Sequence, residues 1–216
     1  YTTLFRSRQS ARMREICALA PVVPVIVIHD AAHAAPLARA LVAGGLPVLE
    51  VTLRTPAALD AIRAMAKVQG GIVGAGTLLR REDVLRAKEA GATFGVSPGA
   101  TFSILEACEE AELPLLPGAS TASEVMALLE RGYTTMKFFP AEPAGGVPFL
   151  KSLASPLPAA HFCPTGGITP ANLPRYLELP NVICCGGSWV VPADKVAAGD
   201  WAGIEALAKA AAHPSV

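Results

Sequence analysis

The stretch AAPLARALVAGGLPVLEVTLR, residues 34–54, contains the unit that decides the fold of this chain. Its first half, Ala34 to Ala43, is rich in Ala and Leu and is typical of a helix, which Gly44 would end. Its second half, Leu46 to Arg54, alternates apolar and polar side chains and predicts a strand. A helix, a glycine and a strand in this order indicate a βαβ unit of a parallel sheet.

The same unit recurs along the whole chain. Apolar runs that are too short for buried helices begin near Val22, Leu46, Ile72, Ala92, Pro114, Thr134, His161 and Val182. Ala- and Leu-rich helical stretches separate them, so that the unit repeats roughly every 23 residues. Eight units in 216 residues predict an α/β fold, a single (β/α)8 TIM barrel near its lower size limit. An open doubly wound sheet is the alternative architecture.

The first twenty residues hold four arginines and one acid. Such a composition occurs in transit peptides, but it also suits a short helix that covers one end of the barrel. We expect the helix, from Ala11 to Leu19, with Ser10 as its N-cap. The predicted organisation is therefore residues 1–20 as an N-terminal segment with a capping helix and residues 21–216 as the barrel.

Composition excludes several classes of protein. With 52% hydrophobic and 17% charged residues, the chain cannot be intrinsically disordered. Its 18 basic and 18 acidic residues balance, which gives no general case for nucleic acid or an acidic membrane as partner. The longest apolar run, Pro21 to Ile28, is far shorter than the ~20 residues of a spanning helix.

Cysteines and histidines give no sign of a metal site. The five cysteines form no C-x-x-C pair, which favours buried reduced thiols and a cytoplasmic location. Only His29 and His33 are closely spaced, and that pair is more typical of a solvated loop and a helix start. We therefore expect neither a metal nor another cofactor.

Two Gly-Gly loops follow the seventh and eighth predicted strands. In a barrel of this type, chemistry lies at the C-terminal ends of the strands, and phosphate binds after strands seven and eight. Thr165, Gly166 and Gly167 follow the seventh strand, and Gly187 and Ser188 end the eighth. A single Gly-Gly is usually only a turn, but two in this pair of loops predict phosphate binding through backbone N–H groups.

A lysine lies within the apolar sixth strand, Tyr133 to Pro140. Period-2 alternation puts Thr135 and Lys137 on one face and Met136 and Phe138 on the other. If the apolar pair faces the helices, Lys137 points into the barrel, where burial disfavours the ammonium form and leaves a nucleophilic amine. The alternative is a lysine that extends to solvent at the strand end.

The same alternation points Glu50, Thr52 and Arg54 inward from the second strand. A carboxylate inside a barrel must be paired or functional, so Glu50 is either a proton shuttle or part of an internal salt bridge with Arg54 or Lys137. Arg54 is placed to hold a substrate carboxylate. The third strand ends in Gly74-Ala75-Gly76-Thr77, where glycines would bring the backbone close to a ligand.

Together these groups describe imine chemistry on a keto acid. The amine of Lys137 would condense with the 2-keto carbon of pyruvate, and the protonated imine would let a C3–C4 bond break or form through an enamine, with Glu50 moving protons through water. Two other classes of protein would also have such Gly-Gly loops. One is another phosphate-binding barrel enzyme, such as an isomerase in which Lys137 acts only as a charge. The other is a non-catalytic barrel that binds a phosphosugar.

From about Pro21 to Asp200, the chain resembles the 2-keto-3-deoxy-6-phosphogluconate (KDPG) aldolase family, which includes 4-hydroxy-2-oxoglutarate (KHG) aldolases. The resemblance rests on Pro21-Val-Val-Pro-Val-Ile-Val, Leu49-Glu-Val-Thr-Leu-Arg-Thr, Gly74-Ala-Gly-Thr, Ser97-Pro-Gly, Lys137-Phe-Phe-Pro-Ala-Glu, Pro164-Thr-Gly-Gly-Ile and Gly186-Gly-Ser-Trp. It implies a class I aldolase, a homotrimer of barrels, that cleaves KDPG to pyruvate and D-glyceraldehyde 3-phosphate in the Entner–Doudoroff pathway. KHG cleavage and oxaloacetate decarboxylation are implied as side activities.

The resemblance also implies a role for individual residues. Lys137 would form the Schiff base and Glu50 would be the general acid and base. Arg54 and Thr77 would hold the pyruvyl carboxylate of the substrate. Phe139 would pack over the imine, Pro98 would line the pocket, and Thr165 would lie by the substrate. The phosphate would be bound by Gly166, Gly167, Gly187 and Ser188. His29 stands where many relatives carry a basic residue near the phosphate, which leaves an unphosphorylated substrate such as KHG as a second activity.

Overall fold

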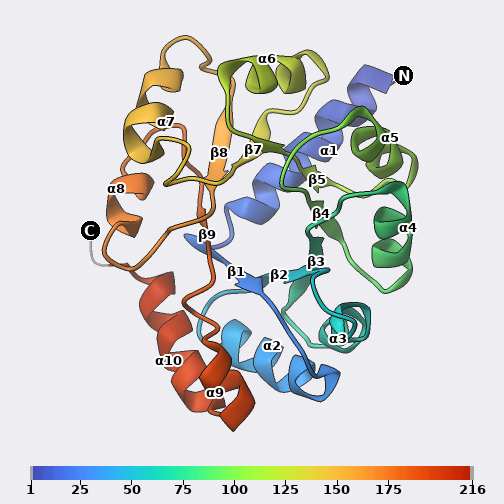
Figure 1. Ribbon diagram of the computed structural model, residues 1–216, viewed down its shortest axis with the longest axis vertical. Helices are drawn as coiled ribbons and strands as arrows, with labels where there is room; N and C mark the ends of the chain where they lie inside the picture. Colours follow the sequence, from blue (N-terminus) through green and yellow to red (C-terminus); the bar gives the residue numbers. More distant parts are fainter. Residues whose placement is uncertain (1, 215–216) are drawn as a thin grey trace.

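Parallel strands lie side by side around one axis, and helices surround them (Figure 1). The structure is a computed structural model that describes residues 2–214, with side chains from residue 8 onward. Its strands are β1 (Val22–Ile26), β2 (Val48–Thr52), β3 (Ile72–Gly76), β4 (Phe94–Val96), β5 (Leu115–Leu116), β6 (Gly118–Ala119), β7 (Thr135–Phe138), β8 (His161–Pro164) and β9 (Cys185–Gly187). Each strand begins within four residues of a predicted start, and β5 and β6 share the fifth of these starts.

The strands pair in chain order and the barrel closes. One sheet has the order β5-β4-β3-β2-β1-β9, and a second has the order β6-β7-β8, with parallel pairing throughout. Pro117, which has no N–H to donate, separates β5 from β6. Bridges from Phe162 to Val182 and from Thr165 to Gly186 join β8 to the β9 segment. This closure confirms the predicted barrel and excludes the open sheet.

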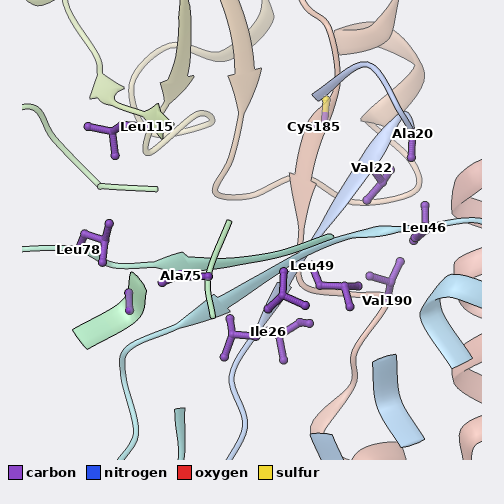
Figure 2. Close-up of a cluster of buried hydrophobic side chains, with 14 of the residues drawn as sticks. Ala20, Val22, Ile26, Leu46, Leu49, Ala75, Leu78, Leu115, Cys185 and Val190 are labelled. Carbon is purple, nitrogen blue, oxygen red and sulfur yellow. The ribbon is translucent and has the colours of Figure 1, made fainter. Parts of the chain in front are cut away.

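Helices cover the outer side of the strands. They are α2 (Ala34–Ala43), α3 (Ala58–Met65), α4 (Arg81–Glu89), α5 (Phe102–Glu110), α6 (Ala122–Glu130), α7 (Gly146–Ala154), α8 (Leu173–Leu177), α9 (Ala193–Ala198) and α10 (Trp201–Ala212), with a short 3-10 turn at Ala31–His33. The main hydrophobic core lies between these helices and the strands. Figure 2 shows part of that layer, including Ile26, Leu49 and Ala75.

A second, smaller core fills the interior of the barrel. Its buried side chains come from alternate strand positions and from the N-terminal helix, and include Val23, Val48, Phe94, Val96, Leu116, Cys163 and Cys184. Helix α1 (Thr2–Cys17) passes across one end of the barrel and adds Met13, Ile16 and Cys17 to this core (Figure 1). The expected capping helix is therefore present.

The predicted start of that helix is wrong. Helix α1 begins at Thr2, so Ser10 lies within it and is no N-cap. The Ser10 hydroxyl is buried and accepts a hydrogen bond of 2.8 Å from the Thr134 backbone N–H, which ties α1 to the start of β7. Of the predicted domain bounds, residue 1 and residues 215–216 lie outside the described part of the chain.

All five cysteines lie in the described part of the chain, and each is buried and unpaired, as predicted. Burial raises the pKa of the Cys108 thiol to about 12, so this side chain remains protonated at neutral pH. Within residues 2–214 we find no helix with the length and apolar character needed to cross a membrane.

Candidate active site

Lys137 and Glu50 meet inside the barrel. Lys137 is on β7 and Glu50 on β2, and the Nζ of Lys137 lies 3.3 Å from the Oε1 of Glu50. Their side chains are 4% and 3% exposed, respectively. Burial of two charged groups is tolerated because each neutralises the other. The structure therefore confirms both inward orientations and, of the proposed salt bridges, forms the one between Glu50 and Lys137.

Gly76 provides the space for the Glu50 carboxylate. A Cβ placed on Gly76 would overlap the Oε1 atom of Glu50, and one placed on Gly74 would overlap the Phe94 ring. Protein side chains therefore occupy the space above both glycines. Pairing of β2 with β3 puts Gly74 directly beside the large inward Glu50, and Gly76 lies two residues further along β3.

An aromatic ring covers the lysine from the end of its own strand. The Nζ of Lys137 lies 5.2 Å from the centroid of the Phe139 ring, within the range of a cation–π contact. Phe139 is half-buried, so it shields the amine without closing it off. Lys137, Glu50 and Phe139 therefore form one cluster.

Arg54 and Thr77 meet at the C-terminal ends of β2 and β3. The Nε of Arg54 donates to the Oγ1 of Thr77 at 3.2 Å. Arg54 is exposed and Thr77 is half-buried, so both are accessible from solvent. The φ angle of Thr77 is +62°, a left-handed conformation that is costly for a β-branched residue. Strain of this kind is concentrated at functional sites, which supports Thr77 as a binding residue.

The two Gly-Gly loops lie next to each other. The bridge between Thr165 and Gly186 joins them, and a Cβ on Gly186 would overlap the Thr165 hydroxyl. Gly166 and Gly167 both have positive φ angles, +103° and +82°, which only glycine adopts readily. Ser188 is exposed at the end of the second loop. The two loops are therefore adjacent at the C-terminal end of the barrel.

The remaining predicted residues lie at the same end of the barrel. Pro98 is half-buried after β4, and a Cβ on Gly118 would overlap its carbonyl group, so the Pro98 segment rests on β6. His29 is exposed after β1, whereas the ring of His33 packs edge-on to Trp201 at 5.7 Å. Between residues 2 and 214, no three His, Cys, Asp or Glu side chains lie close enough to hold a metal ion together.

Sequence reasoning missed a group of side chains behind the first Gly-Gly loop. Glu142, Asn172 and Tyr176 contact that loop or each other. Glu142 occurs in the Lys137-Phe-Phe-Pro-Ala-Glu motif, but its position in the sequence does not indicate its hydrogen bond to Tyr176 on α8. That contact forms only in the folded chain.

Comparison with known proteins gives a consistent match. The family model described as "KDPG and KHG aldolase" matches residues 13–207. The "KHG/KDPG aldolase" of Escherichia coli is 55% identical over 192 residues, which cover 88% of this chain and 90% of the relative.

Solved structures agree with the sequence match. A 2-keto-3-deoxy-6-phosphogluconate aldolase of Zymomonas mobilis, solved with 3-phosphoglycerate, has a TM-score of 0.89 and 53% identity, covering 93% of this chain and 95% of that one. A KDPG aldolase from Legionella pneumophila has a TM-score of 0.90 and 45% identity, covering 93% and 98% of the two chains. That crystal holds pyruvate captured as a covalent carbinolamine intermediate.

Proposed function

The chain belongs to the KDPG and KHG aldolase family, and from this membership we propose that it cleaves KDPG to pyruvate and D-glyceraldehyde 3-phosphate as a class I aldolase. The observation that carries the proposal is the buried contact of 3.3 Å between Lys137 and Glu50. A phosphate-binding isomerase or a sugar-binding barrel has no need of such a pair. In metabolism, this reaction is the cleavage step of the Entner–Doudoroff pathway.

Imine formation begins with a proton transfer. Glu50 takes a proton from the Lys137 ammonium group, since the two atoms are within proton-transfer reach. The free amine attacks the C2 carbonyl carbon of the keto acid and forms a carbinolamine. Protonation of the carbinolamine hydroxyl by Glu50 expels water and leaves a protonated imine on Lys137. The face of Phe139 stabilises this cation at a distance already set by the strand.

Carbon–carbon cleavage uses the imine as an electron sink. Glu50 removes the proton of the C4 hydroxyl through a water molecule, C4 becomes the aldehyde carbon, and the electrons of the C3–C4 bond pass into the imine. The resulting enamine takes a proton at C3, and water then hydrolyses the imine. Pyruvate leaves, and Lys137 returns to the free amine.

The two ends of the substrate would bind on either side of this pair. Arg54 and Thr77, joined by their own hydrogen bond, would hold the keto acid carboxylate. Gly166, Gly167, Gly187 and Ser188 would bind the phosphate, and Thr165 and Pro98 would line the pocket between the two ends. In this proposal residues 21–216 are the catalytic domain and residues 1–20 cap it.

A second substrate, KHG, is supported by the close relative named for both activities. The same imine cleaves KHG to pyruvate and glyoxylate and can decarboxylate oxaloacetate. We also propose a homotrimer and a cytoplasmic location. The exposed apolar side chains Leu79, Leu85, Phe102 and Met126 near α4, α5 and α6 support the first, and the buried unpaired thiols support the second.

The test is a kcat/KM panel on phosphorylated and unphosphorylated keto acids with three variants. Lys137→Ala should abolish cleavage. Glu50→Gln should lower kcat by ~10²-fold or more, as loss of a general base does. Ser188→Ala should raise KM for KDPG more than for KHG. Near-normal turnover by Glu50→Gln would remove Glu50 from its role, and equal effects of Ser188→Ala on both substrates would remove Ser188 from the phosphate site.

A further inference from the structure

The first Gly-Gly loop is held from behind by the chain that follows β7. The Ala141 N–H donates to the Thr165 carbonyl at 2.8 Å, and the Glu142 N–H donates to the Gly166 carbonyl at 3.1 Å. These bonds turn two successive carbonyl groups of the loop toward the start of α7. They hold the loop to the strand that carries Lys137.

The next carbonyl of the loop is held by a side chain. The Nδ2 of Asn172 donates to the Gly167 carbonyl at 2.9 Å, while its Oδ1 accepts from the Thr169 N–H at 2.8 Å. Asn172 therefore fixes both the end of the loop and the turn that leads into α8. Three consecutive carbonyl groups, Thr165 to Gly167, thus have defined donors.

Glu142 also packs against the loop from the side. A Cβ on Gly167 would lie 2.7 Å from the Glu142 Cγ, so the stem of Glu142 covers that face of the glycine. The Glu142 carboxylate accepts a hydrogen bond from the hydroxyl of Tyr176, which is completely buried on α8. Burial and this bond raise the pKa of the Tyr176 phenol above its ordinary value, so it remains a donor at neutral pH.

We propose that Glu142, Asn172 and Tyr176 are positioning residues that hold the Thr165–Gly167 loop in its phosphate-binding shape and so set the preference for phosphorylated substrates. This rests on the proposed function. Two successive glycines have more accessible conformations than any other pair of residues, so an unsupported Gly-Gly loop would bind an anion at a large entropic cost. The contacts behind the loop order it before the anion binds, so that less conformational entropy is lost on binding, and these side chains need not contact the substrate.

The test compares Tyr176→Phe with Tyr133→Phe. Both variants remove one hydroxyl from a buried tyrosine that donates to a glutamate, but Tyr133 bonds Glu109 away from the loop. Tyr176→Phe should raise KM for KDPG and the inhibition constant of inorganic phosphate about three- to tenfold, the usual effect of one hydrogen bond. Its kcat, and its half-saturation for pyruvate in borohydride trapping, should stay at the wild-type values. Tyr133→Phe should change none of the four.

Two further variants separate the effect of the Tyr176–Glu142 hydrogen bond from that of the Glu142 charge, and test a second contact with the loop. Glu142→Gln keeps an acceptor for Tyr176 and should resemble the wild type, whereas Asn172→Ala should reproduce the phosphate defect. Unchanged phosphate affinity in Tyr176→Phe, or an equal loss for pyruvate and phosphate, would overturn the proposal. A wild-type protein that forms no pyruvyl adduct would instead overturn the proposed function, so the two failures are distinguishable.

Discussion

At the scale of single residues, the position of the Glu50 carboxylate depends on the absence of a side chain at Gly76. Glu50 leans into the space above Gly76, which any larger residue would fill. The carboxylate thereby reaches the Lys137 amine across the interior of the barrel. Alternation along the strands predicted that Glu50 and Lys137 point inward, but it could not predict what fills the space above a glycine. Which side chain occupies that space depends on side-chain length and rotamer, and the alternation of apolar and polar residues contains no information on either.

The variant Gly76→Ala tests this dependence. Its Cβ would displace the Glu50 carboxylate, and a shift of about 1 Å at a catalytic group costs as much as ~10²-fold in rate. We expect kcat for KDPG to fall by about that factor while the circular dichroism spectrum is unchanged.

The matched control is Gly99→Ala, where a Cβ has no neighbour within 4 Å. Gly99→Ala should keep wild-type kcat. A Gly76→Ala variant as active as this control would show that the placement of Glu50 is not set by the glycine.

At the scale of elements, helix α1 and strand β7 are connected at the end of the barrel opposite the active site. The buried Ser10 hydroxyl accepts from the Thr134 N–H, one residue before β7 begins. Most helices and strands could be predicted to within a few residues, because hydrophobic periodicity reports burial directly. The start of α1 could not, because a serine in a helix interior and one at an N-cap look alike in sequence.

We therefore expect Ser10→Ala to lower the free energy of unfolding without changing kcat. The change leaves the half-buried Thr134 N–H without its Ser10 partner, at a cost of about 1 kcal/mol. Urea denaturation with an activity assay at low denaturant measures both quantities.

Arg12→Ala is the control on the same helix, because the side-chain contact that Arg12 makes within the described part of the chain is an exposed ion pair with Glu15. Such pairs contribute less than about 1 kcal/mol. Equal unfolding free energies for the two variants would mean that the Ser10 contact does not hold α1 in place.

At the scale of the whole molecule, closure of the barrel is what makes the active site. It brings β2 and β7, 87 positions apart at Glu50 and Lys137, to opposite sides of one interior. The repeat of strands and helices predicted this closure, and the Gly-Gly loops predicted where an anion would lie. The support behind the loop was not predictable, because it joins α8 to the β7–α7 turn through tertiary contacts alone.

The proposed homotrimer is a property of the same scale. Light scattering should give a mass about three times the 22.3 kDa of one chain, and Phe102→Glu should reduce it by introducing charge into an apolar surface. A wild-type mass of one chain would contradict the proposed assembly.

In the proposed mechanism Lys137 forms a covalent imine with the substrate, and reductive trapping detects this imine. After incubation with pyruvate and borohydride, the intact mass should rise by one reduced pyruvyl group, and peptide mapping should locate it on Lys137. The control variant Lys151→Ala, which removes an exposed lysine of α7, should trap pyruvate as the wild type does, and Lys137→Ala should not. Absence of an adduct, or an adduct on another lysine, would rule out Lys137 as the Schiff-base residue.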